Sequence, residues 1–275
     1  MSGFLDDMAR SSALRVASAL RQESAADLER RARAMPPAPP LRRSDAGFDV
    51  IAELKLRSPA AGRLGDERED WLGRVAAYAR GGAAAVSVLT EPSRFDGSLQ
   101  HLRQAAAVLA PLGVPTMRKD FLVDPYQVLE ARAAGAGGVL VILRMLPRER
   151  AAQLLDVAAE HGMFVLLEAF DADDLESARG LMASRTGSAH SILIGVNSRD
   201  LQTLKVVPER FAALAPHLPD GWPAVAESGV ASADDARRMR TLGYRMALIG
   251  SALMSSDDPS RLLGEIFDAT RTVRT

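Results

Sequence analysis

The chain has 275 residues, of which 47% are hydrophobic and 25% are charged, an ordinary globular composition with enough apolar material for a sizeable core. The formal net charge is -1, with Lys+Arg 34 against Asp+Glu 35, which gives no reason to expect DNA or an anionic membrane as a partner. Cysteine is absent, which excludes disulfides, thiolate metal sites and thiol nucleophiles.

Residues 1–7 are acidic where a signal peptide is basic, and no apolar core follows them. No apolar run approaches the length that crosses a membrane. We therefore expect a cytoplasmic protein that is a monomer or a weak homo-oligomer, with no nucleic-acid or membrane partner.

Residues 4–34 are rich in Ala, Leu, Arg and Glu with helical spacing, and they predict an N-terminal helix. The proline-rich run 35–40 ends it, because proline lacks the backbone donor that a helix needs. We expect 1–34 to be an N-terminal helical extension and 35–48 a Pro-rich linker that lets the helix lie across the main body. One helical segment cannot build its own core, so we expect a single domain over 1–275.

After the linker, strand-like and helix-like segments alternate every 25–30 residues or so, roughly the size of one strand–helix unit. The strand-like segments are nearly continuous apolar runs, as in strands covered on both faces: 49–54, 84–89, 114–118, 138–143, 163–168, 191–196, 223–227 and 246–250. Amphipathic stretches between them predict helices that include 71–79, 99–109, 126–134, 148–160 and 233–242.

Eight such units predict an α/β fold, a closed (β/α)8 TIM barrel with an N-terminal helical extension. The rival is an open doubly wound sheet, which normally carries a glycine-rich turn after an early strand. Residues 53–59 contain no such turn.

Charged side chains stand where several predicted strands end, and in a barrel these ends meet at one rim, where the working groups sit. Charges are costly to bury unless they are paired or used. Glu53 and Lys55 are two apart on an extended chain, so they face the same side. The carboxylate can hold the lysine charged and aimed, and the alternative is a salt bridge that only closes the barrel end.

The cluster Arg118-Lys119-Asp120-Phe121 ends the third predicted strand. Alternation sends Arg118 and Lys119 to opposite sides, so only one points inward, and Asp120 either caps the next helix or neutralises Arg118. A lysine here can donate a proton to a carbonyl, hold an anion or form a Schiff base. The alternative is a solvated charge run in a loop.

Two further strand ends carry polar groups. Glu168 follows four apolar residues, and partial desolvation there favours general-base or general-acid work, with an ion pair to a neighbouring lysine as the alternative. Asn197 offers a donor and an acceptor that can orient a hydroxyl or a carboxylate, although asparagine at a strand end is commonly a turn residue.

Small residues follow the last two predicted strands, in Glu227-Ser228-Gly229-Val230 and in Ile249-Gly250-Ser251-Ala252-Leu253. They let backbone N–H groups approach a phosphate, often with a short helix N-terminus behind them. Each Gly-Ser pair alone is more often just a turn, but the two together favour a phosphate site. No His/Asp/Glu grouping has metal-ligand spacing, so we expect no metal and no cofactor.

The motifs run in a fixed order along the chain. They are Ile51-Ala52-Glu53-Leu54-Lys55 with Ser58-Pro59; Ser87-Val88-Leu89-Thr90-Glu91 with Phe95 and Gly97-Ser98; Arg118-Lys119-Asp120-Phe121; Asp124-Pro125-Tyr126-Gln127 with Glu130-Ala131-Arg132; Glu168; Gly195-Val196-Asn197-Ser198-Arg199-Asp200-Leu201; Glu227-Ser228-Gly229; and Ile249-Gly250-Ser251. In this order they resemble the indole-3-glycerol phosphate synthase family of tryptophan biosynthesis, over nearly the whole chain beyond the linker.

The resemblance implies a carboxy-lyase that acts on 1-(2-carboxyphenylamino)-1-deoxyribulose 5-phosphate, closes the pyrrole ring and expels carbon dioxide and water. By resemblance, Lys119 is the general acid for the ribulose carbonyl. Lys55 pairs with the anthranilate carboxylate and assists dehydration, and Glu168 is a base or stabilises the iminium. The remaining implied roles are positioning by Glu53 and Asn197, contact with the ring nitrogen and hydroxyls by Glu227, shaping of the mouth by Arg199 and Phe121, and phosphate binding by Ser58, Ser228, Gly229, Gly250 and Ser251.

The chain departs from the family pattern at three places. Phe170 stands where a histidine is frequent, Ser198 replaces a common asparagine, and Ala60-Ala61 replaces a more polar pair. A paralogue of a specialised indole pathway is therefore an alternative. Another is a different phosphosugar barrel such as an isomerase, although that chemistry typically uses a cysteine, and a third is a non-catalytic phosphate-ligand binder or scaffold.

Overall fold

The computed structural model describes residues 3–44, 47–58, 62–63, 70–183, 185, 192–200 and 203–271. Its main sheet is a closed barrel of parallel strands in the order β1-β10-β9-β8-β7-β6-β5-β4. The predicted (β/α)8 barrel is confirmed, and the open doubly wound sheet is excluded.

Each barrel strand is a short buried run. The strands are β1 (Asp49–Leu54), β4 (Ala85–Leu89), β5 (Thr116–Lys119), β6 (Gly138–Ile142), β7 (Phe164–Ala169), β8 (Ile192–Asn197), β9 (Ala224–Glu227) and β10 (Met246–Ile249). The small hairpin β2 (Arg57–Ser58) and β3 (Gly62–Arg63) lies in the segment after β1.

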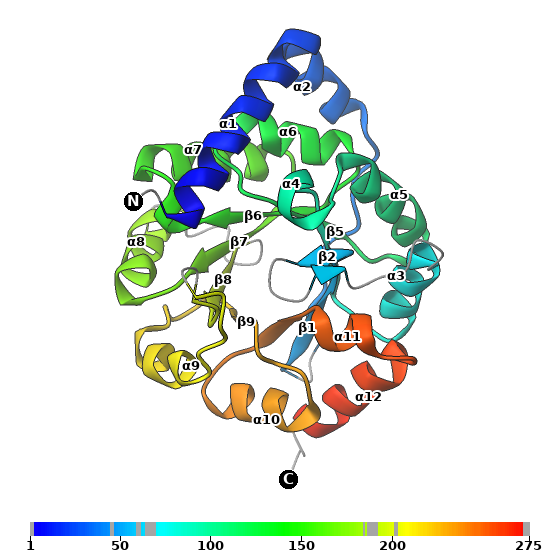
Figure 1. The fold of residues 1–275 in the computed structure, drawn as a ribbon, viewed down its shortest axis with the longest axis vertical. Helices are drawn as coiled ribbons and strands as arrows, with labels where there is room; N and C mark the ends of the chain where they lie inside the picture. The colour runs from blue at the N-terminus through cyan, green and yellow to red at the C-terminus, as the bar shows by residue number, and fades with distance from the viewer. Residues whose placement is uncertain are drawn as a thin grey trace.

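Helices surround these strands (Figure 1). They are α3 (Trp71–Arg80), α4 (Pro92–Phe95), α5 (Leu99–Leu109), α6 (Pro125–Ala133), α7 (Arg148–Glu160), α8 (Ala172–Met182), α9 (Glu209–Leu214), α10 (Ala233–Thr241), α11 (Ser251–Ser255) and α12 (Pro259–Thr270), with single 3-10 turns η1 (Ala110–Leu112), η2 (Leu143–Met145) and η3 (Ala215–His217). Among the described residues, no helix is both long and apolar enough to span a membrane.

One strand differs from the sequence prediction in a way that matters for the site. The predicted strand 114–118 is β5, which begins two residues later and includes Lys119. Pro115 has no N–H for the ladder, and only its carbonyl is used, as acceptor for the Val86 amide. Because β5 extends to Lys119, this side chain projects from the strand itself, at the carboxyl end of the barrel.

The strand alternation divides the core in two. Side chains such as Val50, Val86 and Val139 face the surrounding helices, whereas Ile51 and Met117 fill the barrel interior. The interior positions continue up each strand towards its carboxyl end, where apolar residues give way to polar ones. The register of the barrel therefore decides which charged side chains enter the site.

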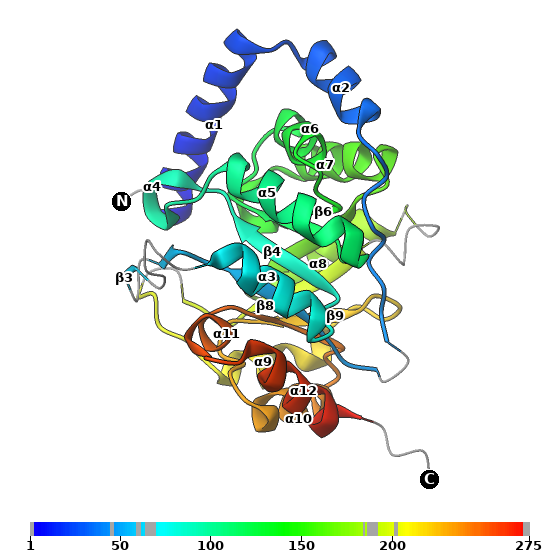
Figure 2. The same ribbon diagram turned by 90° about the vertical axis from the view of Figure 1, so that its right-hand side faces the viewer.

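The N-terminal segment forms two helices, α1 (Phe4–Gln22) and α2 (Ala25–Ala34), so the expectation of one helix was wrong. Ser24 breaks the segment, because its side chain accepts a hydrogen bond from the Asp27 amide and caps α2. Leu28 of α2 packs with Tyr126 of α6. Figure 2 shows α1 and α2 as two arms, with α1 descending on the side of β3 and α4, and the segment after α2 descending on the opposite side.

Candidate active site

Four charged side chains meet inside the carboxyl end of the barrel, three from the strands β1, β5 and β7 and the fourth, Lys55, from the residue that follows β1. The Lys119 Nζ lies 3.8 Å from Glu168 Oε2 and 4.0 Å from Glu53 Oε2. On the other side of the cluster, Lys55 Nζ lies 3.3 Å from Glu53 Oε1. Glu53 therefore lies between the two lysines and pairs with both.

Lys119 is largely enclosed, with 17% of its side chain exposed. Burial by itself lowers the pKa of Lys119, but the nearby carboxylates of Glu168 and Glu53, with a further contribution from Glu227, raise the pKa above its ordinary value. Lys119 is therefore an ammonium group at neutral pH, a proton donor held in a site with little access to water.

Glu227 ends β9 beside this cluster and is 1% exposed. Burial, the charge of Glu168 and a hydrogen bond with Glu168 raise the pKa of Glu227 well above its ordinary value. No N–H or O–H donor from the described residues reaches either Glu227 oxygen or the Oε2 of Glu168. Two carboxylates can share a hydrogen bond only if one of them is protonated, so this environment favours the protonated form of Glu227.

The neighbouring Arg118 points the other way, as the alternation predicted. Its guanidinium is buried outside the barrel wall, where it donates to the Thr90 hydroxyl, the Gln127 carbonyl and Glu130. It also lies 3.0 Å from Asp120, so Asp120 neutralises Arg118, whereas Asp124 caps α6. The alternative of a solvated charge run is wrong.

Asp120 is enclosed by cations. Burial alone raises the pKa of a carboxyl, but Arg118 and Arg15 outweigh it and hold the pKa of Asp120 far below its usual range. The residue after Lys119 is thus a permanent anion at neutral pH, fixed on two sides.

The opposite end of the site is built from backbone. Ser228 and Gly229 follow β9 with φ of 64° and 86°, a left-handed pair, and Gly250 and Ser251 begin α11. A side chain on Gly229 would meet Val206 at 2.7 Å, so only glycine fits there. Lys55 bridges the two ends, because its Nζ lies 3.4 Å from the Ser251 hydroxyl.

The β8 loop is braced by residues that the sequence did not single out for this purpose. Ser198, one of the departures from the family pattern, donates its hydroxyl to the Ser228 carbonyl at 2.7 Å. Arg210 of α9 donates to the backbone carbonyls of Asn197 and Arg199, at 2.8 and 3.1 Å. The departure at 198 thus supports the Ser228 turn.

Phe170 is buried in the barrel interior, with the Arg144 guanidinium 4.6 Å from its ring centre. It does not line the cavity, so a phenylalanine in place of histidine here leaves the titratable groups that line the cavity unchanged. Ala60 and Ala61 lie outside the described residues.

A cavity of about 320 Å³ joins these groups. Twelve predicted site residues line it: Glu53, Lys55, Lys119, Phe121, Glu168, Asn197, Arg199, Glu227, Ser228, Gly229, Gly250 and Ser251. The thirteenth, Ser58, is placed in β2 by its backbone, and its side chain lies outside the described part of the structure. In that same part, no group of three or more His, Asp or Glu side chains is arranged to hold a metal ion.

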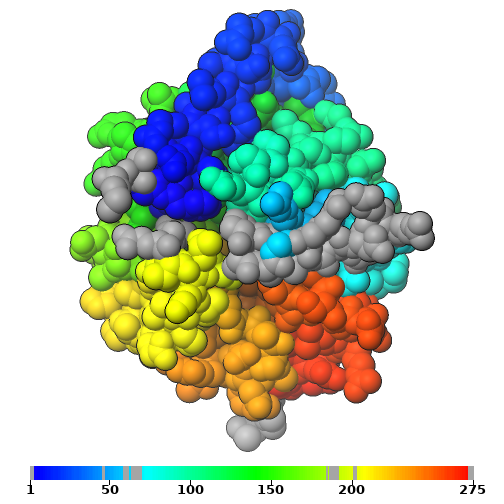
Figure 3. All heavy atoms as spheres, in the orientation of Figure 1, coloured from blue at the N-terminus to red at the C-terminus, as the bar shows by residue number. Residues whose placement is uncertain are grey.

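An aromatic wall completes the cavity and includes two residues absent from the predicted site. Phe4 meets Phe121 edge to face at 5.8 Å between ring centres, and the Phe95 ring centre lies 6.2 Å from that of Phe121 in a tilted arrangement. The first turns of α1 and the segment of α4 are adjacent on the face seen in Figure 3. The N-terminal helix therefore forms part of the cavity wall, with Phe4 and Leu5.

Solved structures with this fold include 3-hexulose-6-phosphate synthase from Salmonella typhimurium, with a TM-score of 0.58 and 14% identity over 81% of this chain and 98% of that chain. Thiamine phosphate pyrophosphorylase from Pyrococcus furiosus gives a TM-score of 0.56 and 16% identity over 82% and 96%. At these identities the likeness concerns the barrel fold alone.

The sequence comparisons are more specific. The family model of indole-3-glycerol phosphate synthase matches residues 5–266. Relatives named indole-3-glycerol phosphate synthase include one from Leifsonia xyli, 41% identical over 95% of this chain and 94% of its own, and one from a Nocardioides species, 46% identical over 78% of each chain. One from Lacticaseibacillus casei is 34% identical over 94% and 96%. The chain therefore belongs to the indole-3-glycerol phosphate synthase family.

Proposed function

We propose that this chain closes the indole ring of 1-(2-carboxyphenylamino)-1-deoxyribulose 5-phosphate, with loss of carbon dioxide and water. The observation that carries the proposal is the convergence of Lys119, Glu168, Glu53 and Lys55 at one end of a cavity. The other end offers Ser228–Gly229 and Gly250–Ser251 to a phosphate. A substrate with a carboxylate at one end and a phosphate at the other matches this polarity.

Lys119 is the general acid in this proposal. Its raised pKa keeps it protonated, and its paired carboxylates fix the ammonium group where a ribulose carbonyl would lie. Donation of that proton as the aromatic carbon attacks avoids a free alkoxide, and such a positioned acid contributes about 10²–10⁴-fold in rate.

Lys55 binds the anthranilate carboxylate until it leaves as carbon dioxide, and it then assists dehydration. Its distance of 3.3 Å from Glu53 supports this role, because the glutamate keeps the ammonium charged and aimed. Glu53 also pairs with Lys119 and so fixes the spacing of the two cations.

Glu168 stabilises the iminium that forms on ring closure and is discharged by loss of carbon dioxide, or it acts as the base that removes the ring proton lost with water in the dehydration step. Its burial and its contact with Lys119 at 3.8 Å support a carboxylate that exchanges protons within the site. Glu227, whose pKa is raised, contacts the ring nitrogen or the hydroxyls, and Asn197 orients these groups.

The aromatic wall of Phe4, Phe95 and Phe121 takes the anthranilate ring, and Arg199 shapes the mouth. Holding the ring against a flexible ribulose chain supplies proximity, which lowers the barrier by removing the search for a reactive conformation. Because α1 supplies Phe4 and Leu5 to the cavity, we propose that the helical extension and the barrel work as one domain, in a chain that is a monomer or a weak homo-oligomer.

The test is to supply this substrate to the purified protein and to record indole fluorescence and carbon dioxide release. We expect both, in equal amounts. Binding without turnover would favour a phosphate-ligand binder, and absence of binding would favour another phosphosugar reaction. Turnover only of a substituted anthranilate substrate would point to a specialised indole pathway.

A further inference from the structure

Gly195 lies inside the strand β8, and glycine weakens a strand interior. The backbone at this position does not need glycine, because its conformation is one that other residues also adopt. Gly195 is not among the residues with positive φ. Its neighbours across the sheet are Glu168 of β7 and Val225 of β9. A glycine in a regular buried strand indicates that another group needs the space of its missing side chain.

That group is the Glu227 carboxylate. A Cβ atom at position 195 would lie 2.0 Å from Glu227 Oε1 and 3.1 Å from its Cδ, far inside van der Waals contact. The Leu166 side chain would be 3.2 Å away. The end of the Glu227 side chain therefore rests directly on the backbone of Gly195.

The position of β8 between β7 and β9 explains why this seat matters. Adjacent strands lie about 4.8 Å apart, so side chains from the two strands that flank β8 are separated by roughly twice that distance. Glu168 and Glu227 nevertheless interact strongly enough for the Glu168 carboxylate to raise the pKa of Glu227. The two side chains approach each other above Gly195, the interior position of β8 that has no side chain to separate them.

We propose that Gly195 is a positioning residue for the ring-closing reaction: its missing side chain forms the seat that holds Glu227 against Glu168 inside the catalytic cluster. The catalytic consequence rests on the function proposed above, whereas the seat itself is a geometric property of the barrel. Gly250 likewise leaves room for a carboxylate of the cluster, because a Cβ there would lie 2.5 Å from Glu53 Oε1.

A methyl group at 195 has a predictable effect, because of what it would displace. The closest atom is the free end of a flexible side chain, so the carboxylate moves and the barrel stays in place. Gly138 provides the contrast within the same barrel interior. A Cβ there would meet the Phe164 ring at 2.4 Å, and a packed ring cannot move without cost to the core.

The decisive experiment is a double-mutant cycle with Gly195→Ala, Glu227→Ala and the two together. We expect Gly195→Ala to lower kcat by at least about tenfold, with a change in KM below about threefold and a melting temperature within a few degrees of wild type. In the Glu227→Ala background, Gly195→Ala should lower kcat by less than about twofold, because no carboxylate remains to be displaced.

Two glycine controls accompany the cycle. Gly264→Ala lies in α12 with open space around the new methyl, and should leave kcat unchanged. Gly138→Ala should lower the melting temperature. The proposal would be overturned if Gly195→Ala lowered kcat by the same factor with and without Glu227. It would also be overturned if Gly195→Ala lowered only the melting temperature, as Gly138→Ala should.

A readout without turnover separates this inference from the proposed function. The groups that face Glu227 are Glu168, Lys119 and Glu53, and Gly195→Ala changes none of them. In carbon-13 NMR of the carboxyl groups, Glu227 should titrate at lower pH in Gly195→Ala than in wild type. An unchanged titration would refute the seat, while wild-type protein with the expected titration but no turnover would refute only the proposed function.

Discussion

The Arg15 guanidinium makes two hydrogen bonds, of 2.9 and 2.7 Å, to the Asp120 carboxylate, and so ties helix α1 to the residue that directly follows Lys119. Arg118 holds the same carboxylate from the barrel side, and the Thr90 hydroxyl donates to it at 2.7 Å. Ser12 of α1 also donates to the Phe121 carbonyl. The first helix and the end of β5 therefore share one buried polar corner.

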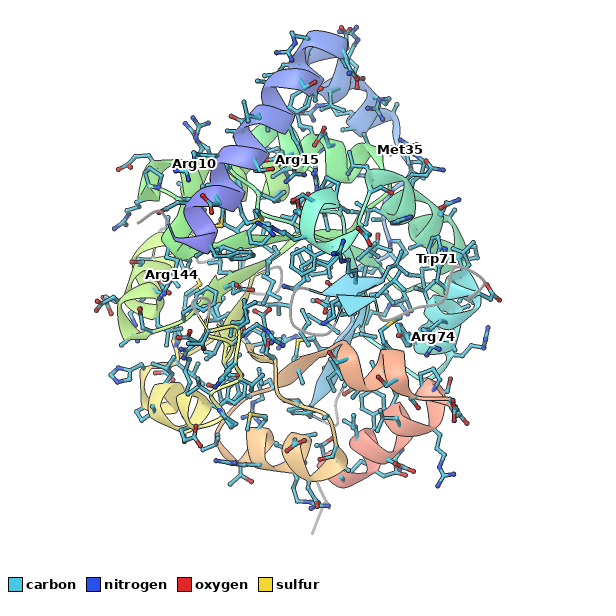
Figure 4. All side chains as sticks on the ribbon, in the orientation of Figure 1. Arg10, Arg15, Met35, Trp71, Arg74 and Arg144 are labelled. Atoms are coloured by element: carbon cyan, nitrogen blue, oxygen red, sulfur yellow. The ribbon has the colours of Figure 1, made fainter. Side chains whose placement is uncertain are left out.

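Arg15→Met is expected to lower the free energy of unfolding by about 1–3 kcal/mol, since it removes two charge-assisted hydrogen bonds but leaves Asp120 paired with Arg118. Arg10→Met is the control, because Arg10 pairs with Asp7 in solvent and leaves α1 on the other side from Arg15 (Figure 4). Urea unfolding of both variants at pH 7 measures the difference. An equal decrease in the free energy of unfolding of the two variants would show that the Arg15–Asp120 pair does not stabilise the contact between α1 and β5.

The same pair predicts a pH dependence. The pKa of Asp120 is lowered in the folded protein, so its stabilising contribution is present above the unfolded carboxyl pKa of about 4 and is lost as the pH falls towards the folded value. The stability gap between wild type and Arg15→Met should therefore be constant from pH 7 to 5 and shrink below pH 4 or so. A gap that widens on acidification, in unfolding curves at each pH, would show that Asp120 is not the partner concerned.

Phe4→Ala should raise KM by about tenfold and change kcat by less than about threefold, because an edge-to-face aromatic contact and its buried area contribute on the order of 1 kcal/mol. The ring lines the cavity but lies against Phe121, not against the acid–base cluster. Leu14→Ala is the control on the same helix, with the side chain 73% exposed. An unchanged KM for Phe4→Ala in steady-state kinetics would contradict the placement of Phe4 in the substrate cavity.

Ser198→Ala removes the hydrogen bond that holds the Ser228 carbonyl in a turn with a φ of 64°. A non-glycine residue in this conformation needs such support, since it costs roughly 1–3 kcal/mol. We expect weaker inhibition by inorganic phosphate and a KM raised about threefold to tenfold. Ser177→Ala, which loses a similar bond to the Asp173 carbonyl on the exposed face of α8, should change neither value.

Much of the fold and of the acid–base cluster was predictable. The fold follows from the alternation of strand and helix segments, and the cluster follows from the alternation of side chains between the two faces of each strand. Glu53, Lys55 and Glu168 continue the interior face of apolar strands, so their convergence follows once the barrel closes. The break at Ser24 was readable too, since Ser24 followed by Asp27 is an N-cap signal. The long run of Ala, Leu and Arg on either side concealed it.

Other features depend on tertiary contacts that no local pattern contains. Phe4 enters the cavity wall only because the first turn of α1 reaches the carboxyl end of the barrel, and its sequence neighbourhood is that of any amphipathic helix. Gly195 lies inside an apolar run. The reason for a glycine there is its contact with Glu227, 32 positions later in the sequence, and no local pattern predicts that contact. The pairing of Arg15 with Asp120 likewise joins two distant segments.

The proton on Lys119 is the centre of the proposed mechanism, and the Lys119→Ala variant tests it most directly. Indole fluorescence should appear when wild type is mixed with 1-(2-carboxyphenylamino)-1-deoxyribulose 5-phosphate, and the variant should be slower by at least about 10²-fold. Circular dichroism and calorimetric titration should show that the variant is folded and still binds the substrate. A folded Lys119→Ala variant that forms indole at the wild-type rate would contradict the account.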